Sequence, residues 1–249
     1  MNSLAQSVTL LLLGGVVLRI SLADVYLRYV KEGLRPYLIA AGVVLVVVAI
    51  ATMIRDLRAD GPADGPADGL ADEAEEHDDG HGHSHRGPSI AWLLTLPVFA
   101  IFLVAPPALG SYAAARSGSA AVQRQAEFAP LPHADPVAMT NVDYATRAIW
   151  DKGTSLRGRT IRLTGFLSPR PAGGFYLTRI LLSCCAADGR PIKIGLDGEL
   201  PAGLKADDWI QAEGQYTVRQ DHNKATRETI VFLTVTSAHP VTPPAEPYE

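Results

Sequence analysis

Three long stretches without charge, all in the first half of the chain, constrain its fold more than any other feature. A helix that crosses the hydrocarbon core of a bilayer needs about 20 consecutive, mostly apolar residues. The second stretch, Pro36–Ile54, has no charged residue and is flanked by Arg35 and Arg55, which is typical of a membrane span. We therefore predict three transmembrane helices, two within residues 1–54 and a third within residues 89–110.

The first two stretches each have an alternative interpretation, and prolines interrupt the third. The first could be a signal peptide, but no positive charge precedes it and no A-x-A-like cleavage site follows it. The second could be a buried helix of a soluble protein. The third contains Pro97 and ends at Pro106 and Pro107, which predicts a bend or an end of the helix near Ala105. We expect all three helices to stay in the membrane in contact with lipid.

Residues 55–88 join the second and third stretches and have a different composition. They hold ten Asp or Glu residues against three Arg, and their repeated GPAD tetrads cannot bury enough apolar surface to fold, so we expect a disordered loop. The loop ends in four closely spaced histidines, His77, His81, His83 and His85. Imidazoles beside carboxylates suit zinc, copper or nickel, so the loop is a candidate metal ligand set; the alternative is a solvated acidic tether.

The carboxy-terminal part, residues 141–249, follows a linker of small residues at 111–140 and can fold without a membrane. Asn141 is placed to cap a helix over about 142–152 that ends at Gly153. Apolar residues then alternate with polar ones, which predicts five short strands separated by turn signals. The expected strands are Ile161–Leu167, Phe175–Leu182, Ile192–Leu196, Trp209–Val218 and Thr229–Val235.

These elements predict an α+β membrane protein in which three transmembrane helices precede a small, mostly-β barrel of the OB type. Barrels of this kind often bind oligonucleotides. After Leu109, however, 15 Lys or Arg residues face 14 Asp or Glu residues, and no basic face with clustered aromatic residues is visible. We expect no nucleic-acid partner.

The two cysteines, Cys184 and Cys185, are adjacent, which excludes a disulfide framework and a four-cysteine zinc module. They lie with Asp188 in a turn after the second expected strand, and three interpretations are open. The turn could bind a metal through a thiolate, Asp188 and a remote histidine, His222 or His239. The thiols could form a strained, easily reduced vicinal disulfide. Alternatively, the cysteines pack inside the barrel and Asp188 only shapes the turn.

Several motifs together resemble one known family. They are the span ending in PPALGS, the segment TIRLTGFL, the SCCAAD turn, DDWIQAEG and the terminal PAEPYE, with Tyr176, Leu177 and Arg179 ahead of the turn. Along essentially its whole length the chain resembles the YcgQ-type family of uncharacterised bacterial membrane proteins. The resemblance implies a multi-pass protein of the bacterial plasma membrane with a permease as its partner, and it singles out Cys185 with Asp188.

The sequence therefore predicts a non-enzymatic accessory subunit of a polytopic permease, with zinc as the first candidate metal. No spacing typical of a catalytic triad or a phosphate-binding loop is present, so no catalytic residue is predicted. The alternative is a stand-alone membrane-anchored protein that binds metal or has thiol-redox activity. Lys and Arg counts favour a cytoplasmic carboxy-terminal domain, whereas analogy with the His-rich loops of metal transporters favours the extracytoplasmic side, to which we lean.

Overall fold

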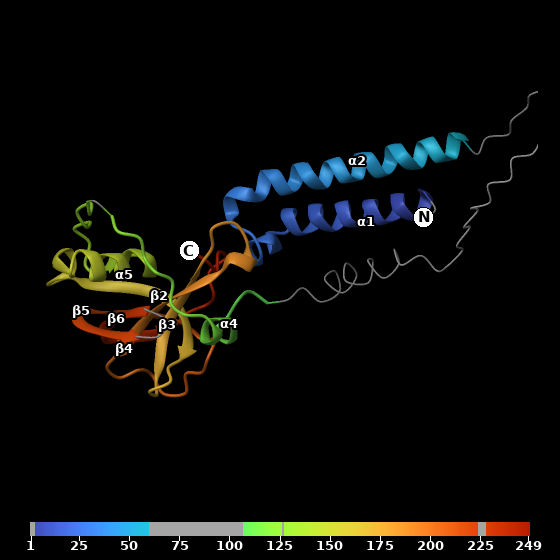
Figure 1. Cartoon of the computed structure of the whole chain (residues 1–249). Coiled ribbons are helices and arrows are strands. Elements are labelled where there is room, and N and C mark those ends of the chain that lie inside the picture. Colours follow the sequence, from blue (N-terminus) through green and yellow to red (C-terminus); the bar gives the residue numbers. More distant parts are fainter. Residues whose placement is uncertain (1–2, 60–106, 126, 224–227) are drawn as a thin grey trace, which may run out of the picture. The chain divides into compact units, whose positions relative to one another are not determined.

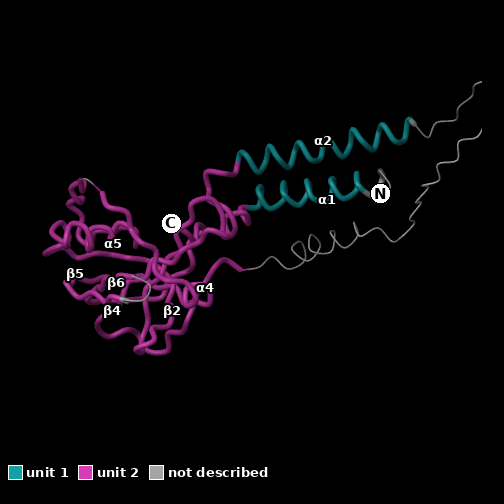
Figure 2. Tube along the Cα trace, in the orientation of Figure 1, with its two compact units in different colours: residues 1–23, 36–106 teal, residues 24–35, 107–249 magenta. Residues whose placement is uncertain are grey.

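Figure 1 shows the computed structural model of the chain, which describes residues 3–59, 107–125, 127–223 and 228–249. The chain forms two compact units (Figure 2). In one unit, residues 1–23 and 36–106, the described part consists of helices α1 (Ser3–Leu22) and α2 (Arg35–Ala59). The other unit combines residues 24–35, here called the connector, with residues 107–249, and it is built around a β-barrel.

Five strands close the barrel: β2 (Thr160–Pro169), β3 (Phe175–Leu181), β4 (Arg190–Asp197), β5 (Trp209–Asn223) and β6 (Glu228–Pro240). They follow the order β2-β3-β4-β6-β5, and β5 pairs back onto β2. Neighbouring strands are antiparallel except β4 and β6, which run parallel. The five-stranded barrel expected from the sequence is confirmed, because the alternation of apolar and polar residues located each of its five strands.

Aliphatic side chains from alternate strand positions fill the barrel interior. On β2, Ile161 and Leu163 are fully buried, whereas Arg162 between them is partly exposed. Burial of each such side chain contributes about 1.5–3 kcal/mol. Helix α5 (Asn141–Trp150) packs against the same core through Tyr144, whose hydroxyl donates a hydrogen bond to the carbonyl oxygen of Phe232 at 2.6 Å. The barrel unit therefore has a complete hydrophobic core of its own.

Strand β2 changes neighbours along its length. Its first part pairs with β5, and its last four residues pair with β3, so β2 and β3 diverge before Phe166. Gly165 lies at the divergence, where a Cβ atom would be 2.7 Å from the carbonyl oxygen of Thr178; only glycine fits. Two short segments cover the backbone that this divergence leaves: β1 (Val137–Ala138) pairs with β2, and Glu249 exchanges backbone hydrogen bonds with β3.

Helix α5 is present where the sequence predicted a helix, but its cap differs. Thr140 is the N-cap, and its hydroxyl accepts a hydrogen bond from the Asp143 N–H at 3.0 Å. Asn141 is the first helical residue. The carboxylate of Glu249 accepts the N–H groups of Asn141 and Val142 at 2.9 and 3.0 Å. The prediction of Asn141 as the cap is wrong because side chains at Thr140 and at Glu249, far along the chain, satisfy these N–H groups.

Helices α1 and α2 pack through small residues. A Cβ atom on Gly14 would lie 3.0 Å from the carbonyl oxygen of Gly42, and one on Gly42 would lie 2.8 Å from Leu18. The hydroxyls of Ser7 and Thr52 are 2.8 Å apart and share a hydrogen bond. Small residues and paired hydroxyls are typical of helix contacts within membranes. The rest of α2 exposes large aliphatic side chains, namely Val43, Val44, Val47, Val48, Ile50 and Ile54.

The expectation of three transmembrane helices is wrong. Within the described residues, one helix, Glu32–Arg58, is long and apolar enough to cross a membrane. The apolar part of α1, Gln6–Leu22, falls short of the roughly 20 residues that a span requires. Nearly all of the third predicted span, 89–110, and of the acidic loop, 55–88, lies outside the described residues. Signal sequences and buried helices have the same length and composition, so the one helix does not by itself assign a location.

Candidate metal centre at the cysteine turn

The turn between β3 and β4, residues 183–188, is organised around one carboxylate. Three consecutive backbone N–H groups, those of residues 183–185, donate to the two oxygens of Asp188 at 2.9, 2.8 and 3.3 Å. Asp188 itself closes a single helical turn, Ala186–Asp188. A carboxylate placed three to five residues after these N–H groups can reach all of them, so the local sequence dictates the shape of this cysteine turn.

The thiol of Cys184 makes a further hydrogen bond to the same carboxylate, with Sγ 2.9 Å from Oδ2 of Asp188. This bond stabilises the protonated thiol and, with a second contribution from Cys185, raises the pKa of Cys184 to about 11. The same bond and the backbone N–H groups lower the pKa of Asp188 to about 2. At neutral pH the turn therefore holds a protonated thiol beside an ionised carboxylate.

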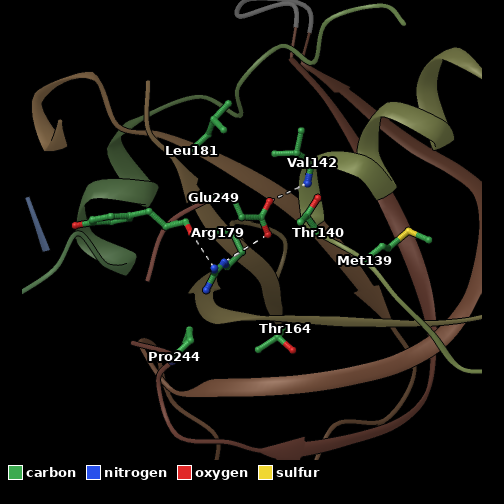
Figure 3. Close-up of a pocket in the computed structure, with 9 residues that line it drawn as sticks. Met139, Thr140, Val142, Thr164, Arg179, Leu181, Pro244 and Glu249 are labelled. Atoms are coloured by element: carbon green, nitrogen blue, oxygen red, sulfur yellow. Dashed lines mark hydrogen bonds and ion pairs between the residues drawn. The ribbon is translucent and has the colours of Figure 1, made fainter. Parts of the chain in front are cut away.

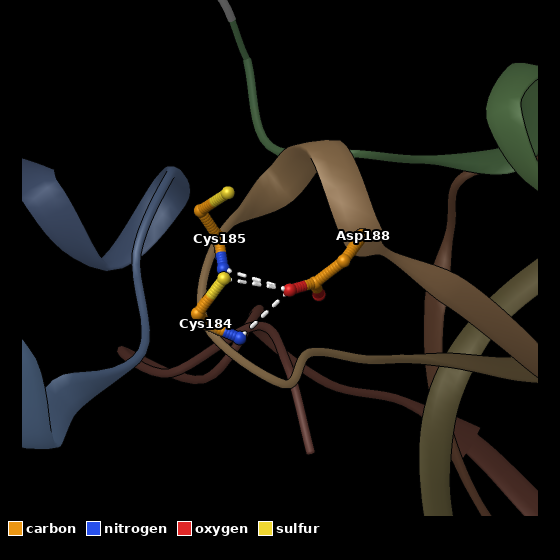
Figure 4. A group of neighbouring side chains, drawn as sticks. All are labelled: Cys184, Cys185 and Asp188. Carbon is orange, nitrogen blue, oxygen red and sulfur yellow. Dashed lines mark hydrogen bonds between the residues drawn. The ribbon is translucent and has the colours of Figure 1, made fainter.

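Three metal-ligand atoms converge at this turn. The Sγ atoms of Cys184 and Cys185 and a carboxylate oxygen of Asp188 all lie within 4.8 Å of one another (Figure 4). In a tetrahedral zinc site with Zn–S bonds of about 2.3 Å, two sulfur ligands are about 3.8 Å apart. Cys184 is exposed and Cys185 is half-buried, so small side-chain rotations can close this difference. Such a site would have one coordination position open.

The cysteine turn is paired with the connector, and this pairing lies within the barrel unit. The Ala186 N–H donates to the carbonyl oxygen of Tyr29 at 2.7 Å, and the Lys31 N–H donates to that of Cys184 at 3.1 Å. Val30 and Cys185 thereby form an antiparallel bridge. Because the bonds use the backbone of both segments, a change in the shape of the turn must also move the connector.

Tyr248 ties the connector to two further segments. Its hydroxyl accepts the N–H of Leu109 at 2.9 Å and donates to the carbonyl oxygen of Arg28 at 2.8 Å. Burial raises the pKa of Tyr248, so the hydroxyl keeps the proton that it donates. Sequence reasoning assigned no role to this residue; the only signal was its place in the PAEPYE motif.

Of the predicted metal ligands, the structure brings together Cys184, Cys185 and Asp188. The other predicted ligands, His77, His81, His83 and His85, lie outside the described residues. Among the residues that the structure describes, no histidine joins the three: His222 and His239 are exposed on β5 and β6. The described residues therefore bring no remote histidine to the turn, and packing of Cys184 inside the barrel is a wrong interpretation, because its side chain is exposed.

The molecule is a closed five-stranded β-barrel protein with an apolar amino-terminal helix. An exposed turn of the barrel unit carries two thiols and a carboxylate. Residues 118–249, more than half of the chain, match the model of the DUF1980 C-terminal domain. The chain belongs to this family. The matched region contains all five barrel strands, α5 and the cysteine turn. No curated protein and no solved structure matches the chain.

Proposed function

We propose that the protein is a non-enzymatic accessory subunit of a polytopic membrane permease and that its cysteine turn binds a divalent metal, zinc first. One observation carries the proposal: two thiols and one carboxylate lie within 4.8 Å of one another on an accessible turn. Thiolates favour zinc and other soft metals, whereas magnesium and calcium prefer oxygen ligands alone. The backbone hydrogen bonds to Asp188 hold the turn in shape before a metal arrives, which reduces the cost of binding.

The accessible position favours capture and transfer of a metal over a structural role. Structural zinc sites are four-coordinate and closed, whereas three protein ligands leave a position for a solute or a partner's ligand. The barrel also has no need of a structural metal, because its interior is filled by aliphatic side chains. A permease that accepts the metal would supply the fourth ligand.

Anchoring in the bacterial plasma membrane is the second part of the proposal. Helix α2 would be the anchor, because its exposed surface is largely aliphatic and residues 36–54 carry no charge. The resemblance to the YcgQ-type family supports both this location and a permease as partner. The barrel unit, which carries the metal ligands, would lie on the extracytoplasmic side.

A stand-alone metal-binding or thiol-redox protein is the second candidate, favoured by two adjacent, accessible thiols. The raised pKa of Cys184 disfavours the redox version, because the thiolate is the reactive species and is scarce at neutral pH. Copurification separates the two functions. An accessory subunit should elute with a co-expressed permease in detergent, whereas a stand-alone protein should elute by itself.

Zinc titration of the full-length chain by calorimetry under reducing conditions tests the metal site. The four loop histidines are first replaced by alanine, so that only the turn is measured. We expect one zinc per chain, with affinity reduced about 100-fold or more in Cys185→Ser and Asp188→Ala, since each removes one of three ligands. Ser183→Ala is the matched control, because Ser183 contributes its backbone N–H to the turn. Unchanged binding in both ligand variants would exclude the site.

Zinc affinity should depend on pH through the thiols. Cys184 is protonated below its pKa of about 11, so zinc must displace that proton, and binding strengthens as the pH rises. Each thiol proton released contributes about a tenfold gain in affinity per pH unit. Asp188 is ionised throughout pH 6–8 because its pKa is about 2, so it adds no dependence there. Titrations at pH 6, 7 and 8 measure this slope; a flat profile would contradict binding through Cys184.

A further inference from the structure

A second site lies where β2 and β3 diverge. The pocket there has a volume of about 580 Å³, within the range of sites for small molecules, and no residue of the cysteine turn lines it (Figure 3). Its apolar walls come from Met139, Val142, Leu181 and Pro244, and its polar groups include those of Arg179, Thr164 and Glu249. The inference drawn from it is therefore independent of the metal proposal.

Arg179 is a buried cation that its neighbours satisfy only in part. The residue is 9% exposed, and its Nη2 donates to the carbonyl oxygens of Glu246 and Tyr248 at 3.3 and 3.0 Å. Its Nε lies 3.4 Å from a carboxylate oxygen of Glu249 but makes no hydrogen bond. Both Glu249 oxygens already accept N–H groups of α5, so this carboxylate is shared between the helix and the guanidinium.

Arg179 is one of the few residues with a buried polar atom that lacks a hydrogen-bond partner. Four such side-chain atoms occur in the part of the chain that the structure describes, and three of them are Nε of Arg179 and both amide atoms of Asn141. Asn141 is fully buried and does not itself line the pocket, whereas Arg179 does. Buried polar groups in native proteins nearly always have a hydrogen-bond partner, and Nε of Arg179 has only the ion pair with Glu249 at 3.4 Å, so the guanidinium has hydrogen-bonding capacity left for a bound molecule.

We propose that this pocket binds a small organic carboxylate with an apolar body, anchored by Arg179. A guanidinium presents a planar set of donors that matches the two oxygens of a carboxylate. Figure 3 shows Arg179 within the pocket, with one side of its guanidinium toward Glu249 and the other facing the space beside Pro244 and Thr164. The Trp209 ring, 5.0 Å from the guanidinium carbon, helps to hold this orientation. The apolar walls select an organic acid over an inorganic anion.

The test uses the purified full-length chain and two fluorinated probes that differ in charge. Ligand-observed ¹⁹F NMR compares 4-fluorophenylacetate with its neutral amide, 4-fluorophenylacetamide. The acid should bind, and the amide should bind about tenfold more weakly or worse, because it lacks the charge that pairs with Arg179. No binding of the acid, or equal binding of acid and amide, would overturn the proposal.

Two variants locate the binding. Arg179→Gln removes the anchor and should abolish binding of the acid. Met139→Trp fills the pocket, keeps Arg179, and should weaken binding about tenfold or more by occlusion; Met53→Trp, the same change on α2, is the matched control and should bind normally. If circular dichroism shows that Arg179→Gln is unfolded, Met139→Trp decides the outcome. Binding to Met139→Trp as tight as to the unmodified chain would place the probe elsewhere and refute the proposal.

Discussion

The barrel and the two-helix unit contain the same kinds of apolar side chain, but the barrel buries them and the helices expose most of them. Leu163 and Leu177 in the barrel are fully buried, whereas Val44 and Val47 on α2 are 60% and 58% exposed. Strand alternation directs the barrel side chains into one closed interior, while among the described residues α1 and α2 bury little beyond the strip around Gly14. The barrel completes its core from its own residues. The helices leave an apolar surface that needs lipid or a partner.

Removing the same side chain from each unit should give the largest contrast. Leu177→Ala, in the barrel, should lower the free energy of unfolding by about 2–5 kcal/mol, because it leaves a cavity among fully buried side chains. Leu12→Ala, on α1, should change it by no more than about 0.5 kcal/mol, because Leu12 is 41% exposed. Urea unfolding followed by far-ultraviolet circular dichroism, which reports helices and strands, measures both. Equal costs would mean that the helices have a core of their own and would break the comparison.

Two charge pairs within the barrel unit, one buried and one exposed, should show the same dependence on burial. Glu249→Gln weakens both the buried pair with Arg179 and the cap of α5, and we expect a loss of about 2–3 kcal/mol. Asp24→Asn removes the exposed pair with Arg35, for which about 0–1 kcal/mol is expected. Both values come from the same urea experiment. A loss below about 1 kcal/mol for Glu249→Gln would show that Glu249 is dispensable for the barrel.

Removing the two-helix unit together with the connector tests whether the barrel is self-sufficient. The barrel core clusters contain no residue before Leu109, so a chain of residues 107–249 should fold with nearly the same midpoint of thermal unfolding. It lacks Tyr29, however, which accepts the N–H of Ala186. Hydrogen exchange at Ala186 should therefore be about tenfold faster than in the full chain, while exchange in β2 is unchanged. An unfolded fragment would show that the helical unit or the connector supports the barrel.

The smallest expected effect concerns the contact between the helices. The hydrogen bond between Ser7 and Thr52 should contribute about 0.6 kcal/mol, the average for such bonds in membrane helices. A double-mutant cycle with Ser7→Ala and Thr52→Val, read from thermal loss of helical circular dichroism in detergent, measures the coupling. Thr52 also donates to carbonyl oxygens of its own helix. The double-mutant cycle is therefore needed to separate the Ser7–Thr52 bond from these other interactions. A coupling of zero would leave packing at Gly14 as the sole support.

The fold could be predicted where the signal is local. Apolar alternation revealed all five strands, and Gly153, in a left-handed conformation with φ of 67°, ends α5 as expected. Long-range contacts left no such signal. The two-residue strand β1 and the capping of α5 by Glu249 depend on segments that meet only in the folded barrel.

The candidate sites, too, could be predicted only where their residues are close in sequence. Cys184, Cys185 and Asp188 lie within five residues of one another, so a turn that brings them together is readable from the sequence. Pairing of this turn with Tyr29 joins distant parts of the chain and was not predictable. Arg179 was noticed only as part of a motif, because no local pattern reveals that an arginine will be buried beside a pocket.

The pairing of β2 with β5 closes the barrel and thereby also limits how the protein can bind a partner protein. Every strand of the barrel has a hydrogen-bonded neighbour on each side over part of its length, and β1 and Glu249 cover backbone where β2 and β3 diverge. Addition of a foreign strand is therefore restricted to short stretches, such as the part of β5 beyond Gln215, which pairs with β6 alone. Over the rest of the barrel a partner must recognise side chains and turns, and among the described residues the turn at 183–188 offers both accessible thiols and a carboxylate.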